Sequence, residues 1–340
     1  MAKKTAHWLK PEQKKRLFAL ARKFKHARIL VVGDFILDHF VWGTVERISP
    51  EAPVPVVNVK RESYMPGGSL NVAHNIRTLG GTVYPSGVVG RDIAGRMLLK
   101  TMRRQGIDTS GIIYDRKRPT SLKTRVIAHS QQVVRFDREK TEPISREDTK
   151  ALLAFYEKKI KSADVLIIED YGKGVIQSEL VHAVVTTARR LRKPILVDPK
   201  EHHFDYYRGV TSLTPNRKEA YGAYRQLVAG ATGRESLETV GFGLLKKLQS
   251  ESMLITLGED GMALFQKNGK VNVIPTAAQE VFDVSGAGDT VIATFALALA
   301  AGARLLEAAL IANLAAGIVV GKLGTASVNT EELEAPIRSA

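Results

Sequence analysis

The sequence predicts an α/β fold of three layers, α/β/α, in which a mainly parallel sheet lies between helices and carries a small β-strand lid. From residue 145 onward, predicted strands alternate with predicted helices, which is the order that builds parallel sheets. Several strands are continuous apolar runs, as is typical of strands buried on both faces. Polar or glycine-rich motifs follow these strands, at the edge where such sheets bind ligands.

The first half of the chain has no regular order of helices and strands. Residues 11–26 predict an amphipathic basic helix that begins at Pro11. Residues 52–60 alternate and contain prolines, which favours an edge strand. Residues 121–138 contain two alternating segments around a polar turn, which predicts a β-hairpin. The other predicted elements are strands at 28–35 and 82–90 and helices at 68–79 and 95–106.

The second half repeats strand and helix. The predicted helices cover 146–161, 178–192, 235–249, 287–301 and 305–321, and the predicted strands cover 163–171, 194–200, 212–216 and 252–258. We expect one domain over residues 1–340. We also expect the lid to come from two segments inserted in the core, at about 41–60 and 112–138.

The composition excludes several classes of protein. The 340 residues carry a formal charge of +15 and no cysteine, which excludes disulfides and thiolate chemistry. No apolar run reaches the roughly 20 residues that span a bilayer, and no apolar signal core follows the first residues. We therefore expect a cytoplasmic protein without a membrane partner. The positive charge is mostly scattered and aromatic residues make up 6%, which argues against a nucleic-acid partner.

The strongest motif is DVSGAGDT at residues 283–290, at the start of an apolar helix. Gly286, Ala287 and Gly288 have little side-chain bulk, so their amides can approach an anion at the helix N-terminus. Asp289 lies in the first helical turn, where a carboxylate can accept a proton from an attacking hydroxyl. We expect the helix dipole to lower its pKa. A glycine-rich cap with an aspartate that interacts with the dipole is the structural alternative.

Three weaker motifs supply further polar groups. Gly67 and Gly68 precede a helix whose first turn carries Asn71, which suits sugar hydroxyls. TPNRKE places Asn216 and Glu219 on one face of a helical turn, as oxygen ligands for a hard cation or as a capping box. TLGEDG, with Thr256, Gly258 and Gly261, is a strand-to-turn segment suited to nucleotide phosphates.

Together, in this order, the four motifs resemble those of the ribokinase-like carbohydrate kinases, the PfkB family. The resemblance implies direct phosphoryl transfer from ATP to a sugar hydroxyl, with Asp289 as catalytic base and residues 286–288 as anion hole. It implies that Asn216 and Glu219 hold Mg²⁺ indirectly, through water and phosphate. It assigns Thr256, Gly258, Gly261, Gly286 and Gly288 to ATP and places Asn313 beside the adenine. A monovalent cation near Asp283 and Ser285 is a further option in this family.

One branch of the family fits better than the others. VERISPEAPVPVV at residues 45–57, with EDYGKG and RFDRE, is similar to the heptose-7-phosphate kinases of lipopolysaccharide core synthesis. That resemblance implies phosphorylation of D-glycero-D-manno-heptose 7-phosphate at the anomeric hydroxyl, which gives the 1,7-bisphosphate used to make ADP-heptose. Many relatives carry a second, nucleotidyltransferase domain, and this chain resembles the kinase part alone. A homodimer through the lid is expected from the same relatives.

A sugar that already carries a phosphate needs cations away from the reacting hydroxyl. Lys123 and Arg125 in the lid, with Lys173 and Lys200 after core strands, are the candidates. Asp38 aligns with the family's sugar-binding aspartate. Asp34, Asp137 and Asp170 are further candidates for sugar hydroxyls, and a structural role stays open for each. His129, His202 and His203 have no third ligand at metal-site spacing, so we expect surface histidines.

Other functions remain open. A kinase for ribose, fructose or fructose 6-phosphate would carry the same motifs apart from the lid and the 45–57 segment. A non-catalytic sugar sensor on this fold would not need Asp289.

Overall fold

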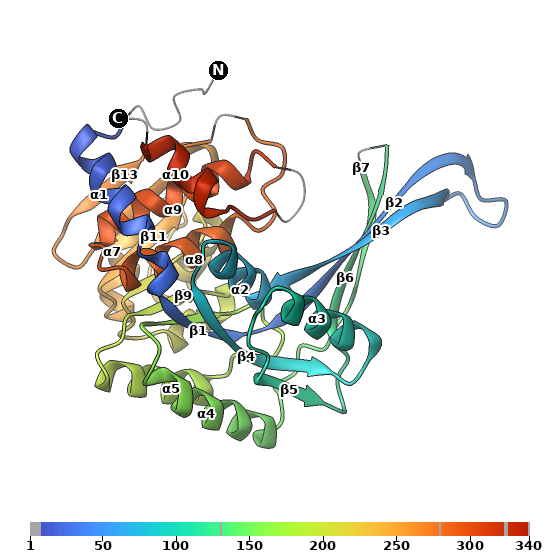
Figure 1. Cartoon of the computed structure of the whole chain (residues 1–340), viewed down its shortest axis with the longest axis horizontal. Coiled ribbons are helices and arrows are strands. Elements are labelled where there is room, and N and C mark those ends of the chain that lie inside the picture. Colours follow the sequence, from blue (N-terminus) through green and yellow to red (C-terminus); the bar gives the residue numbers. More distant parts are fainter. Residues whose placement is uncertain (1–7, 130, 279, 323–325, 339–340) are drawn as a thin grey trace.

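The structure is a computed structural model that describes residues 8–129, 131–278, 280–322 and 326–338. Within these residues, nine strands form a large sheet in the order β13-β12-β11-β10-β9-β8-β1-β4-β5 (Figure 1). Strands β5 to β11 are parallel in that order, and only β12 and β13 at one edge run antiparallel to their neighbours. The strands are β1 (Arg28–Gly33), β4 (Thr82–Gly90), β5 (Gly111–Asp115), β8 (Val165–Glu169), β9 (Ile195–Asp198), β10 (Ser212–Leu213), β11 (Ser252–Thr256), β12 (Met262–Gln266) and β13 (Val271–Ile274).

Helices cover both faces of this sheet. The first layer consists of α1 (Pro11–Ala21), α2 (Ser69–Thr78), α3 (Ile93–Arg104), α8 (Ala287–Ala300), α9 (Leu305–Val319) and α10 (Thr330–Arg338). The second consists of α4 (Arg146–Ile160), α5 (Ser178–Arg190), α6 (Arg217–Leu227) and α7 (Leu237–Leu248). Successive side chains of a strand point to opposite faces, so Leu30 packs in one layer and Val31 in the other. The predicted three-layer fold is confirmed.

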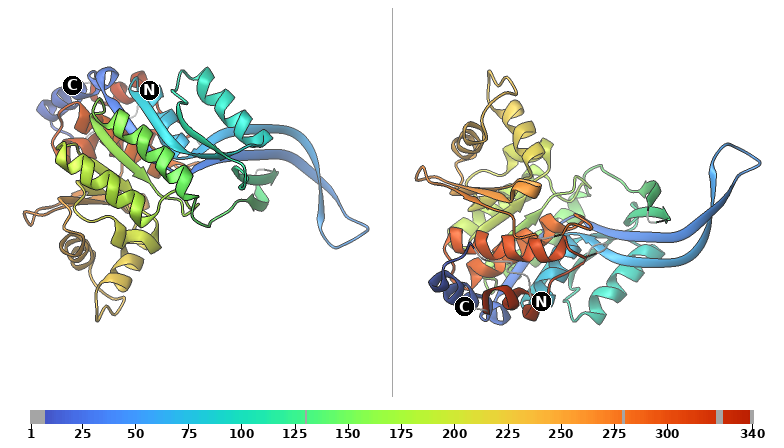
Figure 2. Two further views of the ribbon diagram at one scale, coloured as in Figure 1. Left: turned by 90° about the horizontal axis from the view of Figure 1, so that it is seen from below. Right: turned by 90° about the horizontal axis from the view of Figure 1, so that it is seen from above.

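A second, four-stranded sheet projects away from the core, as all three views show (Figures 1 and 2). It has the order β3-β2-β6-β7 and consists of β2 (Phe35–Ile48), β3 (Pro55–Gly68), β6 (Ser121–Ala128) and β7 (Gln131–Arg138). The predicted lid therefore exists, but its predicted bounds differ from these. Residues 111–115 form β5 at the edge of the large sheet instead, because their apolar pair Ile112 and Ile113 packs beside β4.

The carboxyl ends of β1, β8, β9 and β11 meet at one edge of the large sheet, beside the N-terminus of α8. Strand β2 begins two residues after β1 ends, so the small sheet starts at this same edge. Short turns of 3₁₀ helix at Phe24–His26, Glu201–Tyr206 and Gly258–Asp260 complete the described elements. Among the described residues, no helix is both long enough and apolar enough to cross a membrane.

Candidate active site

Asp289 lies in the first turn of α8 and is 5% exposed. Gly286 caps this helix with φ 77°, a left-handed conformation that favours glycine. The amide of Ala287 donates to the carbonyl oxygen of Val284 at 3.2 Å. An anion bound by the amides of residues 286–288 would compete with this hydrogen bond for the Ala287 amide. The predicted anion hole stays a prediction.

Two donors hold the carboxylate of Asp289. Nδ2 of Asn71, in α2, donates to Oδ2 at 2.6 Å, and the hydroxyl of Tyr171 donates to Oδ1 at 2.6 Å. Asn71 was predicted to bind sugar hydroxyls, and in this structure its amide is bound to the predicted base. The sequence analysis assigned no role to Tyr171, although it follows a buried strand in the EDYGKG motif.

Burial raises the pKa of Asp289 to about 6, and the hydrogen bonds from Tyr171 and Asn71 act in the opposite direction. The pKa is therefore raised rather than lowered as expected, because the loss of solvent is the largest effect on this carboxyl group. A carboxyl group with a pKa near 6 is still mostly ionised at neutral pH, as a base must be.

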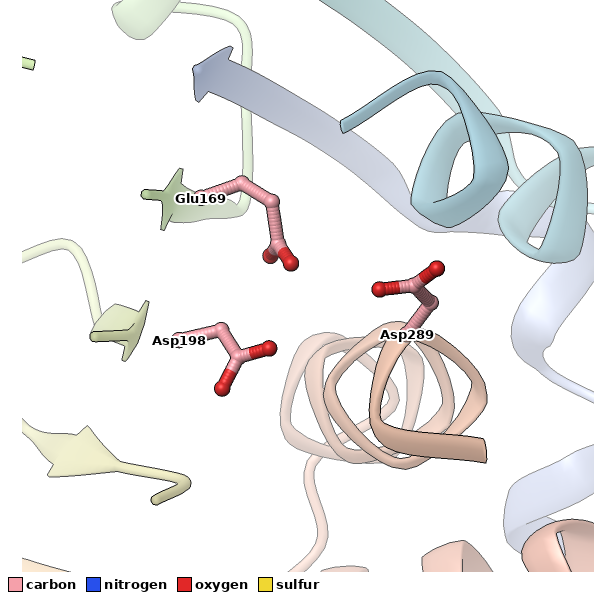
Figure 3. A group of neighbouring side chains, drawn as sticks. All are labelled: Glu169, Asp198 and Asp289. Atoms are coloured by element: carbon pink, nitrogen blue, oxygen red, sulfur yellow. The ribbon is translucent and has the colours of Figure 1, made fainter. Parts of the chain in front are cut away.

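Three carboxylates meet beside the first turn of α8 (Figure 3). One ligand oxygen from each of Glu169, Asp198 and Asp289 lies within 4.8 Å of the other two. Glu169 is fully buried, and no donor group among the described residues hydrogen-bonds either of its carboxylate oxygens. Burial raises the pKa values of Glu169 and Asp198 well above their usual range, and the neighbouring carboxylates raise them further.

A buried, unpaired carboxylate beside two others fits a hard divalent cation, which binds oxygen ligands. The predicted metal residues lie next to this cluster. Asn216 and Glu219 form a reciprocal capping box at the start of α6, with both bonds at 2.9 Å. The charge of Glu219 raises the pKa of Asp198, which places the two carboxylates in one electrostatic environment. Sequence reasoning missed Glu169 and gave Asp198 no role.

The small sheet brings a second group of polar residues to the same edge. Arg125 on β6 donates to Asp38 on β2 at 2.5 Å, and its guanidinium lies 5.3 Å from the centre of the Phe40 ring. A Cβ atom on Gly67 would lie 2.1 Å from the Asp38 carboxylate, so glycine is required there. Gly68 has φ 57°, and a Cβ atom there would lie 2.6 Å from the backbone carbonyl oxygen of Asp34, at the turn into α2.

Two lysines of the predicted phosphate cradle lie near Tyr171. Lys123 has its ammonium 5.6 Å from the ring centre of Tyr171, and Lys173 pairs with Glu139 at 2.6 Å. Burial, then the charge of Lys173, lowers the pKa of Lys123. A Cβ atom on Gly172 would lie 3.6 Å from the stem of Lys200, and the charge of Lys200 acts on Glu219, so Lys200 lies near a residue predicted for ATP.

Three of the predicted sugar-binding aspartates have protein partners. Asp34 is fully buried and accepts from the amides of Tyr171, Lys173 and Val175 at 2.9–3.1 Å. Asp170 accepts from the Gly172 amide at 2.7 Å, from His203 Nδ1 at 2.6 Å and from the Tyr207 hydroxyl. Asp137 pairs with Arg135 at 3.2 Å. Asp34 and Asp170 thus fix the loop at 170–175, and His203, expected at the surface, is half-buried against Asp170.

The other predicted nucleotide residues lie in β11, in the turn after it and in α9. Thr256 ends β11 and forms an isolated bridge with Asn216. Gly258 and Gly261 have φ 65° and 87°, and a Cβ on Gly261 would meet the Ile274 carbonyl at 2.1 Å. Asn313 is 3% exposed and donates to the Pro275 carbonyl at 2.8 Å. The amide of Ser285 donates to Asp283 at 2.9 Å. These roles stay predictions.

Comparison with known proteins identifies the class. A model of the pfkB family carbohydrate kinases matches residues 26–332, so this chain belongs to that family. A protein named "Bifunctional protein HldE" from Wolinella succinogenes is 45% identical over 313 residues, 92% of this chain and 65% of that protein. The protein of the same name from Geobacter metallireducens is 46% identical over 315 residues, 91% of this chain and 63% of that protein. The chain spans about two thirds of the length of these relatives.

Solved structures share the fold. Arabidopsis thaliana ribokinase in complex with ribose and ATP aligns with TM-score 0.70 and 19% identity, over 92% of this chain and 99% of that one. Escherichia coli phosphofructokinase-2 in complex with potassium aligns with TM-score 0.75 and 16% identity, over 92% and 98%. The predicted ribokinase-like fold is therefore confirmed.

Glu169→Gln is expected to raise the melting temperature in metal-free buffer and to weaken the stabilisation by Mg²⁺. The amide removes one negative charge and one oxygen ligand from the buried cluster. In the unmodified protein, Mg²⁺ at ten times its Kd should stabilise the fold by about 1.4 kcal/mol. Thermal unfolding across a Mg²⁺ titration measures both effects. Glu157→Gln, on the exposed face of α4, is the matched control. An unchanged Mg²⁺ response in the Glu169 variant would show that Glu169 is not a ligand.

Proposed function

We propose that this chain transfers the γ-phosphoryl group of ATP to the anomeric hydroxyl of D-glycero-D-manno-heptose 7-phosphate. The product is the 1,7-bisphosphate, an intermediate on the route to ADP-heptose for the lipopolysaccharide inner core. The family membership and the roughly 45% identity to relatives named HldE support this choice of substrate. We infer a cytoplasmic location because ATP, the proposed donor, is made there.

The observation that carries the proposal is the Asp289 carboxylate at the N-terminus of α8, fixed by Asn71 and Tyr171. In the reaction, Asp289 accepts the proton of the anomeric hydroxyl as its oxygen bonds to the γ-phosphorus and the bond to the β-phosphate oxygen breaks. ADP leaves. The amides at residues 286–288 stabilise negative charge on the transferring group. The small sheet covers the sugar and excludes water that would hydrolyse ATP.

Glu169, Asp198 and, at the rim, Glu219 would hold Mg²⁺. When bound, the cation neutralises charge on the β- and γ-phosphates. The chain's own residues orient the sugar. Asp38 accepts from sugar hydroxyls beside Gly67, and Arg125 holds that carboxylate in place.

The product itself is the primary test. With heptose 7-phosphate, ATP and Mg²⁺, phosphorus NMR is expected to show a new anomeric phosphate signal and ADP in equal amounts. Ribose, fructose and fructose 6-phosphate, assayed in parallel for ADP release, should react at least about 100-fold less efficiently, a difference of about 2.7 kcal/mol. Efficient turnover of one of those sugars instead would overturn the assigned substrate.

Asp289→Asn is the control variant for this assay. It keeps the shape of the side chain and removes its basicity, so kcat should fall by about 10²–10⁴-fold while nucleotide affinity stays near normal. Asp164→Asn is the matched substitution, since Asp164 precedes β8 at the opposite edge of the sheet and pairs with Arg28. A near-normal rate in Asp289→Asn would disprove its role as base.

We infer that Lys123, Lys173 and Arg125 receive the phosphate that the sugar already carries. The Lys173 side chain lies close enough to Lys123 for its charge to lower the pKa of Lys123. An anion between the two lysines would relieve this repulsion. The carboxylates of Asp38 and Glu139 hold Arg125 and Lys173 in the absence of substrate. A dianionic phosphate is a stronger partner for these cations than a single carboxylate.

Lys173→Met is expected to raise the KM for heptose 7-phosphate by about 10- to 100-fold, because it removes a charge-assisted hydrogen bond of about 1.5–3 kcal/mol. The KM for ATP should change less than about twofold, since the loss is confined to the sugar side. Lys158→Met on the exposed face of α4 controls for the lost charge. Equal increases in both KM values would place Lys173 outside a dedicated sugar-phosphate site.

We also infer that two copies of the chain associate through the small sheet. Phe136, Val134 and Tyr64 are 58%, 49% and 38% exposed. Strand register places them on one face, in the cross-strand rows of His39 and Val41. Asp38 and Arg125 lie on the other face. A large apolar area on a two-sided sheet is typical of a surface that a partner covers, and the same face of a second copy has the same chemistry.

Phe136→Glu is expected to convert a dimer to a monomer, because it replaces the most exposed of these three side chains with a charge. Analytical ultracentrifugation at micromolar protein measures the change. Val273→Glu is the control, since Val273 is 69% exposed on β13 at the far edge of the large sheet. A monomeric unmodified protein, or a Phe136 variant that stays dimeric, would contradict this interface.

A further inference from the structure

We propose that Tyr171 is a positioning residue that orients the Asp289 carboxylate, and that the small sheet holds Tyr171 in place through its ring and its loop. This inference rests on the proposed role of Asp289 as base. Tyr171 was given no role from the sequence motifs. Through it, the small sheet is physically linked to the proposed reacting centre.

The proposed base has a donor on each of its two carboxylate oxygens. Asn71 donates to Oδ2 and Tyr171 donates to Oδ1, both at 2.6 Å. A carboxylate bound at only one oxygen can turn about its Cβ–Cγ bond, whereas donors on both oxygens fix its plane. Each oxygen keeps a free lone-pair direction, so the sugar hydroxyl can still donate to Asp289. Tyr171 therefore restricts the base without occupying it.

The loop that carries Tyr171 is rigid. The Asp34 carboxylate accepts three amides of this loop, from Tyr171, Lys173 and Val175. Gly174 has φ 85°, and a Cβ there would lie 2.0 Å from the Glu142 carbonyl. The loop backbone is thus fixed before any ligand binds. A phenol on a fixed backbone loses little entropy when it donates, which suits a positioning role.

Tyr171 and its loop also contact the small sheet. Lys123 on β6 places its ammonium 5.6 Å from the Tyr171 ring centre, within the range of a cation–π interaction. Arg118, just before β6, donates to the carbonyl of Lys173 at 2.8 Å and to that of Glu142 at 2.6 Å. Glu139, just after β7, pairs with Lys173. Both ends of the β6–β7 hairpin therefore attach to the loop that presents Tyr171.

Two other roles for Tyr171 make different predictions. If its ring only fills space, loss of the hydroxyl leaves the rate unchanged. If its hydroxyl occupies the place of the sugar hydroxyl, loss of the hydroxyl leaves kcat unchanged or raises it. Only a positioning role predicts a lower kcat that depends on the presence of Asp289.

The test is a double-mutant cycle of Tyr171→Phe and Asp289→Asn, measured on the full chain with whichever sugar the unmodified protein turns over. Tyr171→Phe alone should lower kcat by about 10- to 100-fold, with the KM for ATP changed less than about twofold. In the Asp289→Asn background, the same substitution should lower kcat less than about twofold, because the group it positions is gone.

Tyr156→Phe is the matched control. Tyr156 is a buried tyrosine whose hydroxyl donates to the Val184 carbonyl at 2.6 Å, between α4 and α5. Its variant loses a comparable hydrogen bond and should keep kcat within about twofold of the unmodified protein. An equal fall of kcat in both backgrounds, or no fall in Tyr171→Phe, would overturn the proposal.

The two proposals fail in different ways. A normal rate in Asp289→Asn alone contradicts the base, whereas an additive cycle contradicts Tyr171 only. A crystal structure of Tyr171→Phe gives a readout that does not need turnover. In this variant, Oδ1 of Asp289 is expected to have lost its donor. The carboxylate is then expected to rotate away from its present position against Asn71. A carboxylate unchanged in orientation would overturn the positioning role.

Discussion

The buried carboxylate of Asp289 is the constraint on which the rest of this site depends. A carboxylate without solvent is costly unless donors replace the lost water. The chain supplies these donors from two distant segments, Asn71 in α2 and Tyr171 after β8. The Thr290 hydroxyl donates to Asn75 Oδ1 at 3.1 Å and adds a second link between α8 and α2. The proposed base must be ionised, and these donors stabilise its charge. Helices α2 and α8 and the loop after β8 must therefore keep their positions.

The electrostatics of the site contrast with those of the whole chain. The protein has a formal charge of +15, yet three carboxylates meet beside the first turn of α8, and the structure shows no ion pair between any of them and a described lysine or arginine. Two cations of the predicted sugar side, Arg125 and Lys173, already pair with Asp38 and Glu139. A bound cation in the cluster is the simplest way to balance both the carboxylates and ATP.

The fold and the main motif follow from local sequence, whereas the contacts around the motif do not. The alternation of strands and helices and the glycine-rich start of α8 are patterns within a few residues, so both could be predicted. Tyr171 could not, because its position depends on Asp34, 137 residues earlier, which accepts its amide. Glu169 ends a strand that is otherwise apolar, and its closeness to Asp198 and Asp289 appears only when β8, β9 and α8 are side by side.

The lid shows how strand register combines two tasks in one element. Residues of β2 alternate, so Asp38 and Phe40 face the predicted sugar side while His39 and Val41 lie in the rows of exposed Tyr64, Phe136 and Val134. A slip of one residue in the pairing of β2 and β6 would exchange these faces. It would place apolar side chains over the sugar and charged ones at the proposed contact between copies. Phe40 pairs with Arg125 across these two strands, and the guanidinium of Arg125 lies over the Phe40 ring. This cation–π contact opposes such a slip. The proposed sugar site and the proposed contact between copies therefore depend on the same strand register.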